Sequence, residues 1–361
     1  GAQLGSDTGV ASLRRPFGMG NNFARCKENF GDSDSEEIFQ SRYTSGWFPQ
    51  ALGSGSCSKA YRCWKRGSSR GYAMKAFESN EGASAHAVNE IKVLDALGKH
   101  PRITHMIEYD MKDLMAVRVV LELCEGGQLF DRIRARGYYE EPKAAVVVRQ
   151  VLEAVAFLHS KGVMHRDMKP ENVLLVSRDS DTDVKVCDFG LAKMAPISLQ
   201  NPRGPRSVSF RGSDHYLAPE IIRQEEYGCE VDIWAVGVMS YAVLSGTLPF
   251  SADDLRGTYQ RIIDRQLSFD DEAWERASGL AVTFVSCLLT TNVAQRPKAA
   301  AAVQHQWIIS ACATSDLELE EECDEDEEDE AVSQQSEEDD DSPKSVVEVI
   351  TSGARLRCMN C

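Results

Sequence analysis

The chain has 361 residues and is 42% hydrophobic, so it is long enough to bury one large core or two lobes and still leave spare segments. Its net charge of −16 is uneven, because 17 Asp or Glu and no Lys or Arg lie between Ser315 and Pro343, which leaves 40 basic against 39 acidic residues elsewhere. The near-neutral remainder shows no overall basic surface of the kind that binds nucleic acid, and no apolar run approaches the ~18 residues that span a membrane.

Residues 1–45 are rich in Gly, Ser, Asn and charged side chains without sustained periodicity, and they are expected to form a disordered arm. From residue 46, short strand-like runs alternate with turns, at 48–52, 59–64, 72–77, 103–109 and 117–123. These runs predict a small antiparallel sheet. One helix, ended by Gly98, interrupts them. Its apolar face carries Val88, Ile91, Leu94 and Leu97.

After Gly126 and Gly127 the pattern changes to longer helical segments, of which 143–159 is typical. Its apolar stripe repeats at i, i+3, i+4, i+7 and i+10 through Val148, Val151, Leu152, Val155 and Leu158. The last apolar segment ends near residue 309, and the acid-rich stretch after it has too little apolar surface to offset the entropy of ordering. The predicted organisation is a disordered arm (1–45), a domain at 46–309 with lobes at 46–124 and 125–309, an acidic disordered tail (310–345) and a C-terminal tail (346–361).

Two motifs in the second lobe carry the functional prediction. Residues 165–172 read His-Arg-Asp-Met-Lys-Pro-Glu-Asn, and residues 188–190 read Asp-Phe-Gly. Fixing eight of these positions by chance, at roughly one in twenty each, has a probability on the order of 20 to the power −8. The pair resembles the catalytic-loop and metal-binding motifs of the eukaryotic protein serine/threonine kinase family. The resemblance covers about residues 45–309.

This resemblance implies an α+β, two-lobed kinase fold, with a small antiparallel sheet lobe that contains one main helix and a larger, mainly helical lobe. It implies transfer of the γ-phosphate of ATP to protein hydroxyls, with Asp167 as the catalytic base and Lys169 steadying the γ-phosphate. Asn172 and Asp188 are the implied ligands of Mg²⁺, which prefers hard oxygen donors. A lysine two residues after Asp167 is the serine/threonine-kinase arrangement, so the implied acceptor is Ser or Thr.

The implied nucleotide site begins in the first lobe. Residues 52–60 resemble a hairpin whose backbone amides approach phosphates, although Ser58 replaces the third glycine of the family pattern and Ala60 replaces a valine. Lys75, on the third predicted strand, resembles the lysine that holds the α- and β-phosphates, and Glu90 on the helix is its expected partner. The full set of implied nucleotide-binding residues is Leu52, Gly53, Gly55, Ser58, Ala60, Ala73, Lys75, Glu122, Cys124 and Leu174.

Other residues that match the family pattern are expected to hold the catalytic loop in place. Glu220, in the sequence Ala-Pro-Glu, is expected to pair with Arg296, and Asp232 matches the start of a buried helix beneath the loop. The resemblance also implies a spine between the lobes that consists of Leu94, Ile107, His165 and Phe189. As an alternative, each apolar member of that set is ordinary core, which predicts the same burial.

Residues 122–130 and 299–308 resemble the calmodulin-dependent and calcium-dependent protein kinase group. Gln128 stands where such kinases usually have a Glu that binds an Arg upstream of the phosphorylated residue, so the substrate preference stays open. The sequence contains no calcium-binding loop of the D-x-[DN]-x-[DN]-G pattern and no basic calmodulin-binding helix after the domain. Calcium control within this chain is therefore not expected.

Regulation is predicted at Ser209, which lies three residues before Gly212, where related kinases carry an activating phosphate. Arg166 is the expected partner of that phosphate, and Ser207 is the nearest competing acceptor. The acidic run is expected to be a solubilising tail, or alternatively a docking site for a basic partner or for basic residues of the same chain.

The alternative function from another class is a pseudokinase, which would use the same fold as a scaffold with an acidic docking tail. Only the altered glycine-rich hairpin favours it. The residues that pseudokinases commonly lack are all present here, namely Lys75, Glu90, Asp167, Asn172 and Asp188.

Eleven cysteines are scattered along the chain, and only Cys358 and Cys361 share a CxxC spacing. They are expected to be free thiols in a reducing compartment. The N-terminus lacks a charged-then-apolar signal pattern, so the expected location is inside the cell, in the cytoplasm or the nucleus.

Overall fold

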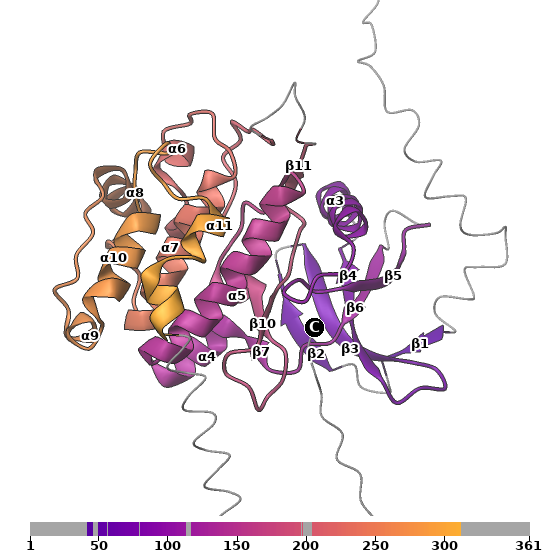
Figure 1. The fold of residues 1–361 in the computed structure, drawn as a ribbon. Helices are drawn as coiled ribbons and strands as arrows, with labels where there is room; N and C mark the ends of the chain where they lie inside the picture. Colours follow the sequence, from indigo (N-terminus) through magenta and orange to yellow (C-terminus); the bar gives the residue numbers. More distant parts are fainter. Residues whose placement is uncertain are drawn as a thin grey trace, which may run out of the picture.

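A small sheet forms the N-terminal lobe of this computed structural model, which describes residues 42–45, 50–55, 57–78, 80–112, 117–195, 197 and 204–311. Most of the expected N-terminal arm (1–45) and of the expected acidic tail (310–345), and all of the expected C-terminal tail (346–361), lie outside the described residues. Within them the sheet has six strands, β1 (Tyr43–Thr44), β2 (Ala51–Ser54), β3 (Ser58–Lys65), β4 (Gly71–Phe77), β5 (Met106–Asp110) and β6 (Arg118–Glu122). All pairs are antiparallel, in the order β1-β3-β4-β6-β5, and β2 also pairs with β3 (Figure 1).

One helix, α3 (Glu81–Leu97), packs on this sheet and confirms the predicted sheet lobe with a single main helix (Figure 1). Asn80 caps its start, because the Asn80 side chain accepts the Ala83 N–H at 2.8 Å. Gly98 ends it with φ at 66°, a left-handed conformation that glycine adopts without strain. The helix buries an apolar face made of Ala83, Ala87, Ile91, Leu94 and Leu97.

The C-terminal lobe is mainly helical, as predicted. Its helices are α4 (Leu129–Arg136), α5 (Glu141–Ser160), α6 (Pro219–Ile222), α7 (Glu230–Ser245), α8 (Leu255–Asp264), α9 (Glu272–Glu275), α10 (Gly279–Leu288) and α11 (Ala299–Ala302). None of the described helices combines the length and apolar character needed to cross a bilayer.

Short strands line the side of this lobe that meets the sheet. They are β7 (Gly127–Gln128), β8 (Val163–Met164), β9 (Val173–Leu175), β10 (Val184–Val186) and β11 (Lys193–Met194). Strands β10, β9 and β7 form one sheet, and β11 pairs with β8. The catalytic-loop motif at 165–172 therefore runs between β8 and β9, and its last three residues form the 3₁₀ turn Pro170–Asn172.

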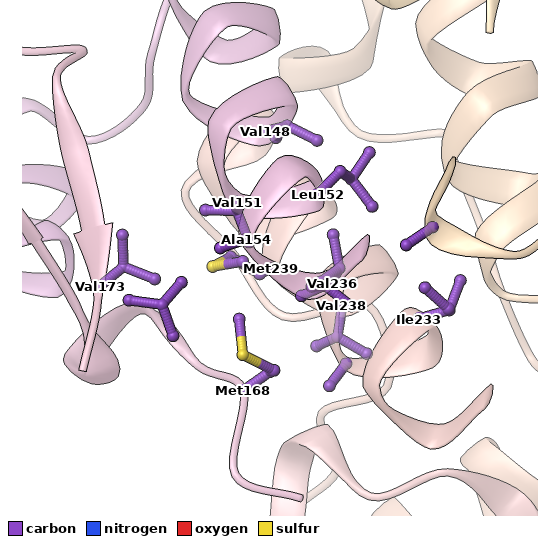
Figure 2. Packing of buried hydrophobic residues seen from close by; sticks show 14 of the residues in the cluster. Val148, Val151, Leu152, Ala154, Met168, Val173, Ile233, Val236, Val238 and Met239 are labelled. Carbon is purple, nitrogen blue, oxygen red and sulfur yellow. The ribbon is translucent and has the colours of Figure 1, made fainter. Parts of the chain in front are cut away.

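The core of the C-terminal lobe is built around α7, of which every residue after Glu230 is buried. A helix that is apolar all round must be covered on all sides, and α5 and α10 pack against it. Figure 2 shows Val151 and Leu152 of α5 facing Val236 and Met239 of α7. Met168, from the catalytic loop, joins the same cluster, so the loop is fixed to the core through its own side chain.

The predicted interlobe spine is wrong at one position. Ile107 is 37% exposed, because the pairing of β5 with β6 shifts register between Met106 and Glu108. Such a bulge reverses the direction in which the extra residue points, and Met106 packs against the core instead. The remaining three members of the predicted set, Leu94, His165 and Phe189, are buried.

The strand β1 lies upstream of residue 46, the expected start of the domain. It pairs with β3, and Tyr43 packs edge-on against Tyr72, with ring centroids 6.0 Å apart. The Tyr43 hydroxyl donates to Glu108 at 3.0 Å. These contacts form a second, smaller apolar cluster, separate from the main core, that contains Tyr43, Cys63, Tyr72 and Val120.

Candidate active site

A cleft lies where the sheet of the N-terminal lobe meets the helical lobe. One cavity in it is lined by both lobes, through Gly55, Cys57, Ser58, Lys75, Phe77, His86, Asp167, Asp188, Gly190 and Leu191. Five predicted site residues from distant parts of the sequence thus face one space. Leu52 and Gly53 do not line this cavity, and Leu52 is exposed on β2.

Strand register explains how Ala60, Ala73 and Lys75 come to share one face of the sheet. Directly opposed residues of antiparallel strands project to the same side, as do residues two apart on one strand. Lys75 on β4 lies opposite Ala60 on β3 and opposite Val119 on β6, while Ala73 lies opposite Leu121. The two alanines therefore leave room on the face that carries the Lys75 side chain.

The Lys75 ammonium connects the two lobes. Its Nζ donates to Glu90 Oε2 on α3 at 2.7 Å and lies 3.0 Å from Asp188 Oδ1 in the C-terminal lobe. Burial alone would lower the pKa of Lys75, but the two carboxylates outweigh burial and raise it, so the amine stays charged at neutral pH. Burial likewise would raise the pKa of Asp188, yet Lys75 holds it below its usual range and keeps the carboxylate ionised. The predicted contact between Lys75 and Glu90 is confirmed.

Asp167 is held by a cluster of three polar side chains. Its Oδ1 accepts the Ser213 hydroxyl at 2.9 Å, and its Oδ2 accepts Asn172 Nδ2 at 2.9 Å. Lys169 Nζ lies 3.0 Å from Asp167 Oδ2 and also donates to Ser213 Oγ at 2.7 Å. The carboxylate is therefore fixed in one orientation, with a cation beside it.

Asp232, at the start of α7, holds the backbone of the catalytic loop. Its carboxylate accepts the N–H groups of His165 and Arg166 at 2.9 and 2.8 Å, and the ring of His159 lies 2.9 Å away. Burial would raise the pKa of Asp232, but the hydrogen bond from His159 and the neighbouring charges outweigh it and lower the pKa. Arg166 has φ at 69°, a strained conformation for a residue with a side chain, and Asp232 is one of the groups that hold it there.

Asp188 lines the cavity, and Asn172 contacts Asp167, which also lines it. Asn172 uses both Nδ2 hydrogen bonds on Asp167, and Asp188 uses Oδ1 on Lys75 and on the Gly190 N–H. Within the described residues, Asn172 Oδ1 and Asp188 Oδ2 have no protein partner. An amide and a carboxylate oxygen suit Mg²⁺, which normally completes its shell with water and substrate phosphates.

The segment between the lobes carries the remaining predicted nucleotide residues. The Glu122 carboxylate is engaged by Lys185 Nζ at 2.8 Å and by the His105 N–H at 2.7 Å, and the Glu122 N–H donates to His105 O at 2.9 Å. Burial raises the pKa of the Cys124 thiol to about 12, which keeps it neutral. Leu174 on β9 lies opposite Gln128 on β7. The Gln128 amide in turn reaches the glycine-rich hairpin, where a Cβ on Gly53 would lie 3.9 Å from it.

Two serines lie near Arg166. Both belong to the stretch of sequence between Asp188 and Glu220, which is called the activation segment in this protein family. Arg166 Nη1 is 3.1 Å from Ser209 Oγ and 3.4 Å from Ser207 Oγ. Ser207 is buried, because it pairs with Tyr227 through two backbone hydrogen bonds, whereas Ser209 is half-buried. The geometry therefore favours Ser209 as the accessible acceptor.

The predicted pair of Glu220 and Arg296 is also confirmed. Arg296 donates to both carboxylate oxygens of Glu220, at 2.8 and 3.1 Å, and both side chains are buried. Arg296 also donates to the carbonyls of Thr290 and Glu230. Arg296 therefore joins the end of the activation segment, at Glu220, to the start of α7 and to the segment after α10.

Sequence reasoning missed five side chains of the site. Ser213 holds Asp167, and the cavity is lined also by Cys57, Phe77, His86 and Leu191. Nothing in the sequence pairs Ser213 with Asp167, which lies 46 positions earlier. Their positions depend on how the lobes close, which local patterns do not encode.

Comparison with known proteins gives a consistent family assignment. Residues 48–308 match the protein kinase domain family. A serine/threonine-protein kinase H1 homolog of Pinctada fucata is 38% identical over 281 residues, which cover 77% of this chain and 65% of the relative. A calcium-dependent protein kinase 7 of Arabidopsis thaliana is 35% identical over 75% of this chain, and the chain spans half of its length. A calcium/calmodulin-dependent protein kinase type 1 of Caenorhabditis briggsae is 37% identical over 72% of each chain.

Proposed function

Because the chain belongs to the protein kinase family, in its calmodulin-dependent and calcium-dependent group, we propose that it transfers the γ-phosphate of ATP to serine and threonine hydroxyls of protein substrates. The observation that carries the proposal is that charged and polar side chains from both lobes gather at the cleft. Phosphoryl transfer needs little covalent help from the protein, but it needs phosphates held and an acceptor hydroxyl aimed in line. Lys75, Asp167 and Asp188 line the cavity in which both needs would be met, and Lys169 and Asn172 bind Asp167.

Asp167 acts as the base in this proposal. It accepts or orients the proton of the acceptor hydroxyl, and its fixed orientation between Ser213 and Asn172 lowers the cost of aligning that hydroxyl. Lys169 stabilises the charge on the γ-phosphate, and Lys75 binds the α- and β-phosphates.

The nucleotide and its metal ion would be held by residues from both lobes. Asn172 and Asp188 would hold Mg²⁺, which when bound neutralises phosphate charge. Gly53, Gly55 and Ser58 of the hairpin would cover the phosphates through their backbone. The adenine site would be formed by Leu52, Ala60, Ala73, Glu122, Cys124 and Leu174.

A transfer assay tests this function. Radiolabelled ATP, Mg²⁺ and a degenerate peptide array are incubated with the wild type and with Asp167→Asn. We expect phosphate on Ser and Thr peptides with the wild type, and a rate about 10²–10⁴-fold lower with the variant, because loss of a positioned base has that effect. Absence of transfer by the folded wild type would leave the scaffold alternative. The array would also identify the substrate preference that Gln128 leaves open.

We further propose that phosphate on Ser209 orders the activation segment by pairing with Arg166. The 3.1 Å approach of these two side chains supports this, because a phosphate adds charge-assisted bonds to a guanidinium already in place. Ser209→Ala should lower activity several-fold, whereas Ser207→Ala, at the buried neighbour, should change it less. Full activity of Ser209→Ala would refute the proposal.

The acidic residues 315–343 are proposed to attract a basic partner, on the basis of their charge density alone. Deleting them should weaken binding of a basic protein and reduce the salt dependence of activity. If both stay unchanged, the run is only a solubilising tail.

The proposed location is inside the cell, in the cytoplasm or the nucleus. The six cysteines of the described residues are all free thiols, which fits a reducing compartment.

A further inference from the structure

Asn89 is the residue before Glu90 on α3, and its side chain contacts the Asp-Phe-Gly segment. The two N–H donors of its Nδ2 group are shared among three backbone carbonyls, with Nδ2–O distances of 3.2 Å to Phe189, 3.1 Å to Gly190 and 2.8 Å to Ala192. A single amide from the N-terminal lobe thus binds three of four consecutive peptide groups in the C-terminal lobe.

The fourth carbonyl of this segment is bound from the opposite side. Leu191 O accepts Arg166 Nε of the catalytic loop at 2.7 Å. The Ala192 N–H closes the turn by donating to Phe189 O at 3.0 Å. Every carbonyl from residue 189 to residue 192 therefore accepts a side-chain donor, either from α3 or from the catalytic loop.

The residue directly before this turn is strained. Asp188 has φ at 64°, and a left-handed conformation at a residue with a side chain is strained and persists only when its surroundings hold it. Lys75 holds the Asp188 carboxylate, and the Asn89 amide holds the backbone that follows. Glu90, the neighbour of Asn89, binds the same Lys75. Adjacent residues of α3 thus restrain Asp188 through its side chain and through its backbone.

We propose that Asn89 is a positioning residue that holds residues 188–192 in the conformation in which Asp188 faces the cleft, and so ties the position of α3 to that of Asp188. Its kinetic consequence rests on the proposed phosphotransfer, but its structural consequence does not. The competing explanation is that Asn89 only fills the hydrogen bonds of half-buried carbonyls and contributes to overall stability.

Hydrogen exchange of the nucleotide-free protein separates these explanations. Asn89→Ala removes the donor, and Asn89→Asp keeps the shape but turns an acceptor toward three carbonyl oxygens. We expect the backbone amides of residues 190–194 to exchange about tenfold faster in Asn89→Ala, and faster still in Asn89→Asp, with the urea midpoint nearly unchanged. Asp95→Ala, an exposed position on the same helix, is the matched control and should exchange like the wild type. Unchanged exchange at 190–194, or a purely global loss of stability, would overturn the proposal.

Kinetics against Mg²⁺ concentration provide the second readout. If Asn89 positions Asp188, its variants should need several-fold more Mg²⁺ for half-maximal rate, and part of the lost activity should return at high Mg²⁺. A residue that acts only on stability would lower the rate by the same factor at every Mg²⁺ concentration, and that result would count against positioning. An inactive wild type would refute the proposed function, and the exchange experiment would still decide the role of Asn89.

Discussion

The charged groups inside the C-terminal lobe differ from those of the cleft in how completely the protein satisfies them. Asp232 is 1% exposed and accepts three donors, and Arg296 and Glu220 form a bidentate, buried pair. In the cleft, the Asp188 side chain is 42% exposed and keeps one oxygen without a protein partner among the described residues. The first group holds the shape of the lobe, and the second is arranged to meet a ligand.

In the described part of the chain, two of the four non-glycine residues with a left-handed φ lie at the cleft, and the other two, Gln224 and Arg265, follow α6 and α8. Asp188 and Arg166, both with left-handed φ, lie at the cleft, and each is held by several hydrogen bonds from the surrounding frame. Substitutions in the interior should therefore cost stability, whereas substitutions in the cleft should cost activity. The contrast between interior and cleft can be tested by single substitutions in each region.

The largest change in stability is expected for Arg296→Met. It leaves the buried Glu220 carboxylate without its partner, and breaking a buried pair in this way costs about 3–5 kcal/mol. Urea unfolding measures the loss. The double variant Arg296→Met/Glu220→Gln should recover part of it, because the uncompensated charge is removed. A loss below about 1 kcal/mol for the single variant would contradict the assignment of this pair to the structural frame.

A smaller effect, on activity alone, is expected for Ser213→Ala. It removes the hydroxyl between Asp167 and Lys169, and we expect kcat to fall about tenfold, which corresponds to ~1.4 kcal/mol. The urea midpoint should stay close to that of the wild type, and Ser213→Thr, which keeps the hydroxyl, should retain most of the activity. An unchanged kcat, or a loss of kcat that unfolding explains, would show that this cleft residue does not act on activity alone.

Acid should weaken the interior through Asp232. Its pKa in the folded protein lies below the value of about 3.9 in an unfolded chain, so its ionised form contributes stability above about pH 4. That stability is lost as the pH falls through the folded pKa, by about 1.4 kcal/mol for each unit by which folding lowers it. Unfolding midpoints between pH 5 and pH 2.5 should fall more steeply for the wild type than for Asp232→Asn. Parallel slopes would show that Asp232 does not carry this dependence.

The smallest effect is expected for an ion pair that belongs to neither group. Arg62 of β3 pairs with Glu125 after β6, but both side chains are accessible to solvent, and such pairs contribute about 0–1 kcal/mol. Arg62→Gln should change the urea midpoint and kcat little. A loss of stability as large as that expected for Arg296→Met would contradict the division, because it would show that a solvent-exposed ion pair stabilises the fold as much as a buried one.

Sequence patterns predicted the parts of this protein that depend on short motifs. The contacts of Lys75 with Glu90 and of Glu220 with Arg296 are confirmed, because each residue lies in a motif whose place in the fold the resemblance supplies. Ile107 was predicted wrongly, since a bulge changes which side chains point inward without disturbing the run of apolar residues.

The long-range hydrogen bonds could not be predicted from the sequence, for a different reason. Asn89 binds carbonyls 100 and more positions later, and backbone carbonyls have no sequence identity that a pattern could recognise. Such contacts exist only once the two lobes have closed. The roles assigned to the site residues remain predictions until the transfer assay is done.

The strand at Tyr43 sets a practical limit on how the protein can be shortened. The family match begins at residue 48, but Tyr43 is 4% exposed and covers Tyr72 and Val120 on the sheet. A recombinant fragment cut at residue 48 would expose that apolar surface and leave the Trp64–Lys65 end of β3 without its β1 partner, and both changes favour aggregation. Expression of the catalytic region should therefore start before Arg42, whose guanidinium also pairs with Glu108 at 2.8 Å.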